Sequence, residues 1–178
     1  MIPPMARARA GPTLAAMHTT EAIHPAVRVG HVHLKVSDLD RAIAFYRDGL
    51  GLTVTADGRP MGIDAAFLAA GDYHHHIALN TFESAGAEPA PCAATGLYHV
   101  AFVYPDRREL GRAVRRLLDR GVFIDHATDH GGTVSVYLAD PDTNGIELYY
   151  DRPRVDWFDA HGRPVLRNER FDHRVLLD

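Results

Sequence analysis

Two related stretches, HVHLKV at residues 31–36 and HVAFVY at residues 99–104, predict the fold of this chain. Both carry the alternating pattern and the β-branched or aromatic side chains of a β-strand. Each precedes a segment in which apolar residues recur at helical spacing, at 39–50 and at 106–120. The stretches lie 68 residues apart, so the chain is expected to contain an internal repeat that starts with a strand and a helix.

Further strand-like segments complete each half of the repeat. They lie at 65–70 and 74–81 in the first half, and at 122–125, 133–139 and 146–151 in the second. IAL at 77–79 matches IEL at 146–148 with an offset of 69. One half alone cannot bury both faces of its sheet. We therefore predict an α+β fold in which two βαβββ modules pair into one domain, with helices outside and a metal cleft between the sheets.

Composition shifts divide the chain into five parts. Residues 1–27 are rich in Ala, Pro and Arg without periodicity and predict a mobile arm. The other predicted parts are a first module at 28–83, a linker at 84–96, a second module at 97–157 and a tail at 158–178. The linker is rich in Pro, Ala and Gly. The tail is polar and arginine-rich, and we expect it to pack or form an interface without chemistry.

The overall composition excludes several classes of protein. The 178 residues are 46% hydrophobic with a net charge of −4, as in an ordinary globular domain. A single cysteine, Cys92, excludes a disulfide framework and a thiolate metal cluster. No apolar run is long enough for a membrane helix, so we expect a cytoplasmic protein without a membrane partner. Arginines recur every four residues from Arg108 to Arg120, but in an acidic chain they indicate a solvated helix face rather than a nucleic-acid site.

Three residues of metal-ligand type occupy repeat-related positions. His31 and His99 open the first strand of each half, and Glu147 lies on the last strand of the second half. Two imidazoles and a carboxylate suit a divalent metal with open coordination positions. Ala78 stands where the first half would supply a fourth ligand, which leaves one side of the metal for water and substrate. His33 is the alternative ligand if the register slips by two residues.

Longer motifs resemble the vicinal oxygen chelate superfamily of glyoxalases, bleomycin-resistance proteins and extradiol dioxygenases. They are GHVHLKVSDLDRAIAFYRDGLGL at 30–52, LYHVAFVYPDRREL at 97–110 and YLADPDTNGIELYYDRP at 137–153. The resemblance covers about residues 27–157. Within the superfamily, YHHHIALN at 73–80, DHG at 129–131 and YLADP at 137–141 look like the small catechol 2,3-dioxygenase-like branch.

The branch resemblance implies a non-haem Fe(II) extradiol dioxygenase whose metal is held by His31, His99 and Glu147. Mn(II), Zn(II) and Ni(II) are the other metals that suit this ligand set. The implied partners are a small catechol-type aromatic substrate and O₂, and we expect a homodimer or a higher homo-oligomer.

The same resemblance implies the residues that move protons. His75 best matches the acid/base histidine, whereas regular strand alternation selects His74 or His76 instead, so the choice stays open. The other residues that the resemblance implies are His130 and Tyr137.

Other activities remain compatible with the sequence. A glyoxalase-like lyase or isomerase would want a fourth protein ligand where Ala78 stands. An antibiotic-modifying transferase would need a cationic pocket, but Lys35 is the only lysine and the arginines cluster on a helix. A metal-free drug-binding resistance protein would leave His75 and His130 without a role.

Overall fold

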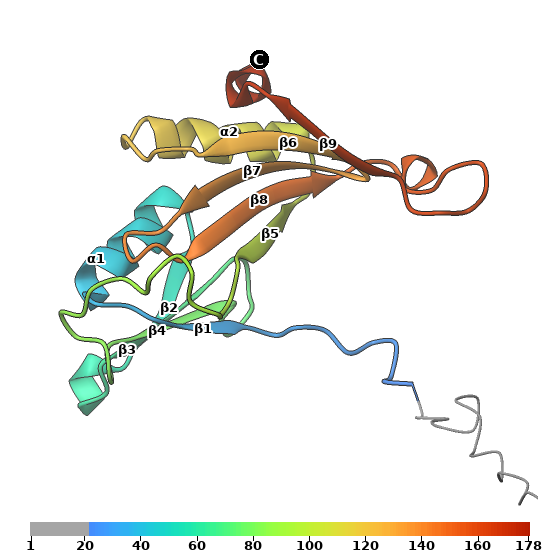
Figure 1. Ribbon diagram of the computed structural model, residues 1–178. Helices are drawn as coiled ribbons and strands as arrows, with labels where there is room; N and C mark the ends of the chain where they lie inside the picture. Colours follow the sequence, from blue (N-terminus) through green and yellow to red (C-terminus); the bar gives the residue numbers. More distant parts are fainter. Residues whose placement is uncertain (1–21) are drawn as a thin grey trace, which may run out of the picture.

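The computed structural model describes residues 22–178, so most of the predicted N-terminal arm lies outside the described residues. The described chain forms two separate sheets (Figure 1). The first sheet has the order β1 (Val32–Lys35), β4 (Ile77–Asn80), β3 (Ala65–Ala69), β2 (Thr53–Asp57). The second has the order β5 (Val100–Tyr104), β8 (Gly145–Asp151), β7 (Thr133–Ala139), β6 (His126–Gly131), β9 (Leu166–Phe171).

The helices are few and short. They are α1 (Leu39–Ala44), which continues into a π-helical turn (Phe45–Gly49), and α2 (Arg107–Leu118), with 3₁₀ turns at Arg59–Met61, Arg154–Asp156 and His173–Leu177. Asp38 and Asp106 cap α1 and α2, because their carboxylates accept the backbone N–H groups of Arg41 and Glu109. Two sheets with few helices confirm the α+β class and the paired βαβββ modules.

Strand pairing reproduces the repeat residue by residue. β1 runs parallel to β4 with Val32 opposite Ile77, and β5 runs parallel to β8 with Val100 opposite Ile146. Ala78 therefore occupies, in the first sheet, the place that Glu147 occupies in the second. Ala78 is fully buried, so the first module offers no ligand there.

The core lies between the helices and one face of each sheet. Leu110, Val114 and Leu117 of α2 are fully buried and belong to the same apolar cluster as Ile146 and Leu148 of β8. Each such side chain contributes about 1.5–3 kcal/mol when it is removed from water. Residues of odd number on β8, such as Glu147, point to the opposite face of the sheet.

The arginine face of α2 is solvated as the sequence predicted, except at Arg116. Arg116 is half-buried and donates from Nε to the carbonyl of Gly49 (2.9 Å) and from Nη2 to that of Leu50 (2.6 Å). It therefore satisfies carbonyl groups at the end of the α1 segment. Arg112, in contrast, pairs with Glu109 at the surface.

Polar contacts of the turn between β7 and β8 hold the two modules together. Asp142 Oδ1 accepts hydrogen bonds from Ser37 N (3.0 Å), Ser37 Oγ (2.5 Å) and Arg41 Nη2 (2.9 Å). The buried hydroxyl of Tyr46 donates to Asp140 Oδ2 (3.0 Å). The start of the first helix is thus fixed to a turn that lies a hundred residues further along the chain.

Four strands differ from the sequence prediction, and β4 is one of them, because it begins at Ile77 and not at His74. Residues 122–125 form a loop, and the strand expected there begins at His126 instead. β2 was not predicted, and neither was β9, which pairs antiparallel with β6 and forms the edge of the second sheet. β9 carries mostly exposed polar side chains and lacks the apolar alternation by which a strand is recognised.

Within residues 22–178, no helix is both long and apolar enough to cross a bilayer.

Candidate functional site

A row of hydrogen-bonded side chains lies on the face of the second sheet that points away from α2. The Tyr137 hydroxyl donates to Glu147 Oε1 (2.8 Å), and His130 Nε2 contacts the same hydroxyl (2.8 Å). His99 Nε2 lies 3.0 Å from Glu147 Oε2. All four side chains are half-buried. Four of the six residues expected from the sequence therefore meet in one continuous row.

Strand register explains why these residues meet. Tyr137 of β7 lies directly opposite Glu147 of β8, and His126 of β6 lies directly opposite Tyr137. Side chains two residues apart on a strand share a face, so His130 points to the same side as His126. The row therefore follows from antiparallel pairing.

The start of β8 positions His99. A Cβ atom built on Gly145 would collide with the carbonyl oxygen of Tyr98 and crowd the side chain of His99. Only glycine allows β8 to run this close to the residues before β5. The close approach brings His99 next to Glu147.

Burial raises the pKa of Tyr137 to about 12, and the hydrogen bond to Glu147 acts in the same direction. The phenol therefore keeps its proton at neutral pH, and its O–H group donates a hydrogen bond to Glu147. Because Tyr137 has only that proton, His130 Nε2 must donate to the phenol oxygen. His130 Nδ1 faces the carbonyl oxygen of Arg167 (3.2 Å), which can only accept.

Arg167 lies on β9, so the C-terminal tail reaches the site. The tail was expected to pack or form an interface, and this contact is a packing contact. The tail supplies a backbone carbonyl, a group that the side-chain pattern of a sequence does not reveal.

The histidines of the first module form a separate group. The rings of His31 and His75 lie 4.5 Å apart, and His75 also packs edge-on against Phe67 (5.1 Å). His74 Nδ1 lies 2.8 Å from His75 Nδ1, while His76 turns toward Tyr73 and its Nδ1 accepts from the backbone of Ala70. Desolvation, followed by the neighbouring histidines, lowers the pKa of His75.

The loop before β4 removes the conflict about strand alternation. β4 begins only at Ile77, so residues 74–76 precede the strand and do not alternate. Phe67 lies opposite Ala78 and shares its side of the first sheet. His75, which packs on Phe67, is therefore the member of the three that lies with His31.

The donor set fits a divalent metal in part. His99 and Glu147 offer an imidazole nitrogen and a carboxylate oxygen side by side, the ligand types that Fe(II), Mn(II), Zn(II) and Ni(II) accept. Across residues 22–178, however, no group of three or more His, Cys, Asp or Glu side chains is close enough to hold a metal ion. His31, the expected third ligand, contacts His75 and not this pair. His33, the alternative, contacts Asn80 (2.8 Å).

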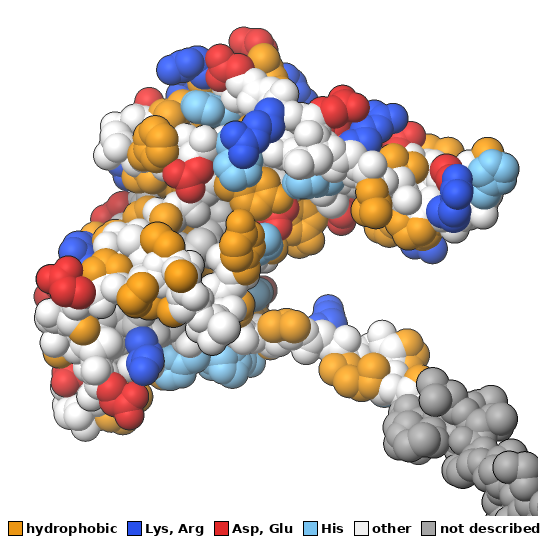
Figure 2. Space-filling model, in the orientation of Figure 1, with side chains coloured by type: hydrophobic (Ala, Val, Ile, Leu, Met, Phe, Trp, Pro, Cys, Tyr) orange, Lys and Arg blue, Asp and Glu red, His pale blue; other side chains and the backbone are white. Residues whose placement is uncertain are grey.

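A cavity of 220 Å³ lies beside the row. Tyr98, His99, His126, Asp125 and Tyr137 contribute to its wall. In Figure 2 several histidine side chains, in pale blue, lie along the hollow on the right side of the molecule. A small aromatic molecule in this cavity would lie next to His99.

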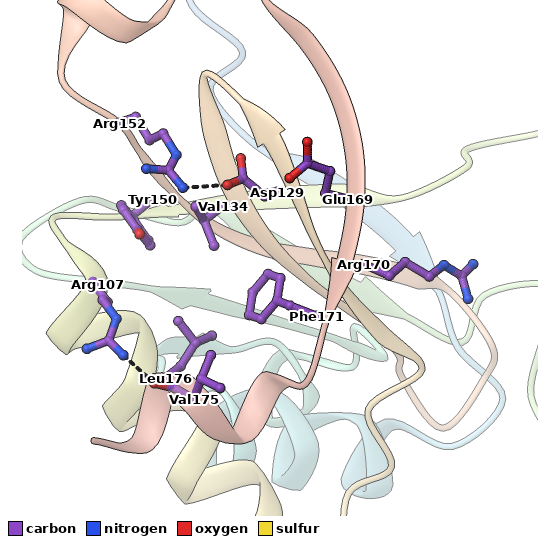
Figure 3. A pocket seen from close by; sticks show the side chains of 10 residues that line it. All are labelled: Arg107, Asp129, Val134, Tyr150, Arg152, Glu169, Arg170, Phe171, Val175 and Leu176. Atoms are coloured by element: carbon purple, nitrogen blue, oxygen red, sulfur yellow. Dashed lines mark hydrogen bonds and ion pairs between the residues drawn. The ribbon is translucent and has the colours of Figure 1, made fainter.

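A second cavity, of 290 Å³, lies on the opposite face of the second sheet, under the C-terminal segment (Figure 3). It contains the Arg152–Asp129 ion pair (2.5 Å), and Arg107 donates to the carbonyl of Val175 at its edge. Its lining includes none of the six residues predicted from the sequence. The chemistry is therefore expected in the smaller cavity.

Comparison with known proteins shows the family of this chain. The sequence model of the Glyoxalase/Bleomycin resistance protein/Dioxygenase superfamily matches residues 28–148. The chain belongs to this superfamily. The match spans both modules and includes His31, His99, Tyr137 and Glu147.

Curated proteins with similar sequences are dioxygenases by name. The chain is 36% identical over 168 residues to a catechol-2,3-dioxygenase of Bacillus subtilis, covering 88% of this chain and 53% of that protein. It is 32% identical over 124 residues to biphenyl-2,3-diol 1,2-dioxygenase 3 of Rhodococcus globerulus, covering 70% and 63%. The chain thus spans between half and two thirds of the length of these relatives.

Solved structures of superfamily members share the fold. A lactoylglutathione lyase from Agrobacterium tumefaciens is 25% identical with a TM-score of 0.55, over 71% of this chain and 96% of that one. A superfamily domain from Frankia is 23% identical with a TM-score of 0.61, over 71% and 98%. The second likeness shows the fold alone.

Proposed function

We propose that this chain is a metal-dependent extradiol dioxygenase that opens the ring of a catechol-type molecule with O₂. The observation that carries the proposal is the row from His130 through Tyr137 to Glu147 and His99, because it joins a proton donor to two metal-ligand side chains. The names of the curated relatives support the same class of reaction.

The proposed metal ligands are His99 and Glu147 with His31 as the third. His31 directly precedes β1 as His99 directly precedes β5, so the repeat assigns it the equivalent place. A divalent metal held by these residues, Fe(II) first among those named, would supply Lewis acidity and redox chemistry to the catechol and O₂. His31 would reach the pair either within the chain or from a second copy in the proposed homo-oligomer.

The remaining side chains bind substrate and move protons. His75 accepts a proton from a catechol hydroxyl, a role that its lowered pKa favours because the imidazole stays neutral. His130 would donate its Nε2 proton, which is hydrogen-bonded to Tyr137 in the free protein, to a substrate oxygen that comes from O₂. The proton that His75 takes up balances this transfer. Tyr137 keeps its own proton, orients Glu147 and forms part of the wall beside the substrate.

A glyoxalase-type lyase is the second candidate, because a solved relative of this fold carries that name. The buried Ala78 opposes it, since this activity would use a fourth ligand in that place. Metal-free drug binding is the third, and it predicts no dependence on metal at all.

Oxygen uptake separates these candidates. The purified protein is loaded anaerobically with Fe(II), mixed with catechol or 3-phenylcatechol, and followed with an oxygen electrode and by the visible absorbance of a ring-opened product. We expect stoichiometric O₂ uptake that is lost in Glu147→Gln. Iron-loaded protein that consumes no O₂ with either substrate would overturn the proposal.

A mixing experiment tests where His31 acts. His31→Ala and Glu147→Ala are each expected to lose metal and activity. Co-expression of the two variants restores part of the activity if a site is shared between copies, because one intact site then forms. If activity is not restored, the site lies within one chain. If His31→Ala retains its full metal content, His31 is not a ligand.

A further inference from the structure

We propose that His126 is a positioning residue that acts through Tyr137; the inference rests on the proposed function and adds a residue to it. The imidazole of His126 stacks on the phenol ring of Tyr137, with centroids 4.6 Å apart and an angle of 17° between the planes. No other aromatic contact of Tyr137 among the described residues is parallel.

The neighbours of Tyr137 show why one stacked ring matters. His130 meets the phenol edge-on, with 88° between the ring planes, and the ring of His99 is tilted by 58°. Neither ring therefore stacks on the flat face of the phenol. The hydroxyl must nevertheless reach His130 Nε2 and Glu147 Oε1, both at 2.8 Å. A flat ring on one side fixes the plane of the phenol and thereby the direction of both hydrogen bonds.

The backbone holds His126 in this place. It is the first residue of β6 and lies directly opposite Tyr137 in the β6–β7 ladder, where facing side chains on one side of a sheet come into contact. Its side chain makes no hydrogen bond or ion pair within the described part of the chain, although it is half-buried and lines the 220 Å³ cavity. Its contribution there is therefore made through its ring.

The orientation of Tyr137 would affect metal binding through Glu147, because the phenol hydroxyl is hydrogen-bonded to this proposed ligand. Partners that orient a metal ligand commonly change metal affinity about 10- to 100-fold when they are removed. An aromatic pair stabilises its geometry enough for an effect of up to about tenfold. We therefore expect loss of the stacked ring to weaken metal binding and turnover several-fold without unfolding the protein.

Three variants isolate the stacked ring. His126→Phe keeps a flat ring, His126→Leu keeps the volume without one, and His161→Leu replaces an exposed histidine far from the row. Zn(II) affinity is measured by competition with a chromophoric chelator, so the readout does not need dioxygenase activity. We expect His126→Leu to bind Zn(II) several-fold more weakly, and His126→Phe and His161→Leu to match the wild type.

The Tyr137→Phe background decides whether the effect passes through the phenol. Without the hydroxyl there is no hydrogen bond to orient, so adding His126→Leu should cause no further loss of Zn(II) affinity or, in the iron-loaded enzyme, of kcat. Equal losses in both backgrounds, or equal losses for Phe and Leu at position 126, would overturn the inference. An enzyme inactive toward catechols would refute the proposed function, while the Zn(II) comparison would still decide the role of His126.

Discussion

His75 is the residue on which the proposed proton transfer depends most. It lies beside His31 and against Phe67, whereas His76 turns toward Tyr73 and Ala70. We expect His75→Ala to lower turnover on catechol by about 100- to 10,000-fold at equal iron occupancy, because general acid–base assistance is lost. His76→Ala serves as the matched control and should stay close to the wild type. The reverse order of effects would transfer the role to His76.

Tyr46 predicts a difference in alkaline stability. Burial, followed by the charge of Asp140, raises the pKa of this phenol far above the ordinary value of 10.0. The folded state keeps the proton that the unfolded state loses above pH 10, so this stabilisation is complete below pH 10 and declines above it. The decline is about 1.4 kcal/mol per pH unit. Urea unfolding at several pH values should show a steeper loss above pH 10 for the wild type than for Tyr46→Phe, and parallel profiles would contradict it.

At the scale of elements, the sequence predicted the strands whose apolar side chains are buried and missed β2 and β9, whose side chains are mostly exposed. The segments at 65–70, 133–139 and 146–151 agree closely with β3, β7 and β8. β6 was placed four residues too early, because Val122 and Ile124 alternate while His126 to Gly131 are mostly polar. Because of this displacement, the sequence assigned no role to His126. His126 and His130 are four positions apart, so in a strand that includes both they lie on the same face.

The same comparison holds for the site. The sequence was enough to predict that His99 and Glu147 lie together, because the first and last strands of a module were expected to line the same cleft. It could not predict the contact of Arg167 with His130, which is made by a backbone carbonyl. It also placed His31 by symmetry alone, and symmetry does not say how far apart the two modules hold their ligands.

A substitution at Gly111 on α2 tests whether the C-terminal turn packs against this helix. A Cβ atom at this position would collide with the carbonyl oxygen of Leu176, which is buried against the helix. Helix propensity alone predicts that Gly111→Ala stabilises the helix by about 1 kcal/mol. We expect the opposite sign, a loss of about 1–3 kcal/mol in the free energy of unfolding, because the turn must shift.

Thermal unfolding of Gly111→Ala checks this, with Gly96→Ala as the control. A Cβ at Gly96 has no neighbour within 4 Å, so that variant should change stability by less than about 0.5 kcal/mol. A higher melting temperature for Gly111→Ala would show that the C-terminal turn does not pack on α2 in solution.

At the scale of the whole molecule, Asp142 joins the two modules. Its side chain is 7% exposed and accepts from Ser37 and Arg41 of the first module. Asp142→Ala leaves these donors without their acceptor and should cost about 1–3 kcal/mol in urea unfolding. Asp151→Ala, at an exposed position, is the control. An unchanged midpoint for Asp142→Ala would mean that the hydrogen bonds of Asp142 do not contribute to holding the modules together.

The parallel pairing of β1 with β4 also governs the order of events during folding. β2, β3 and β4 are neighbours along the chain and can pair as hairpins. β1 cannot pair until β4 is in place, because Val32 lies opposite Ile77. Pairing across so long a separation carries a large loop-closure entropy and is slow. In the same way, β5 can pair only with β8, from which most of the second module separates it along the chain. The strands next to His31 and His99 are thus expected to be the last to dock, so a nascent chain acquires its ligand-bearing edges only after the rest of each sheet has formed.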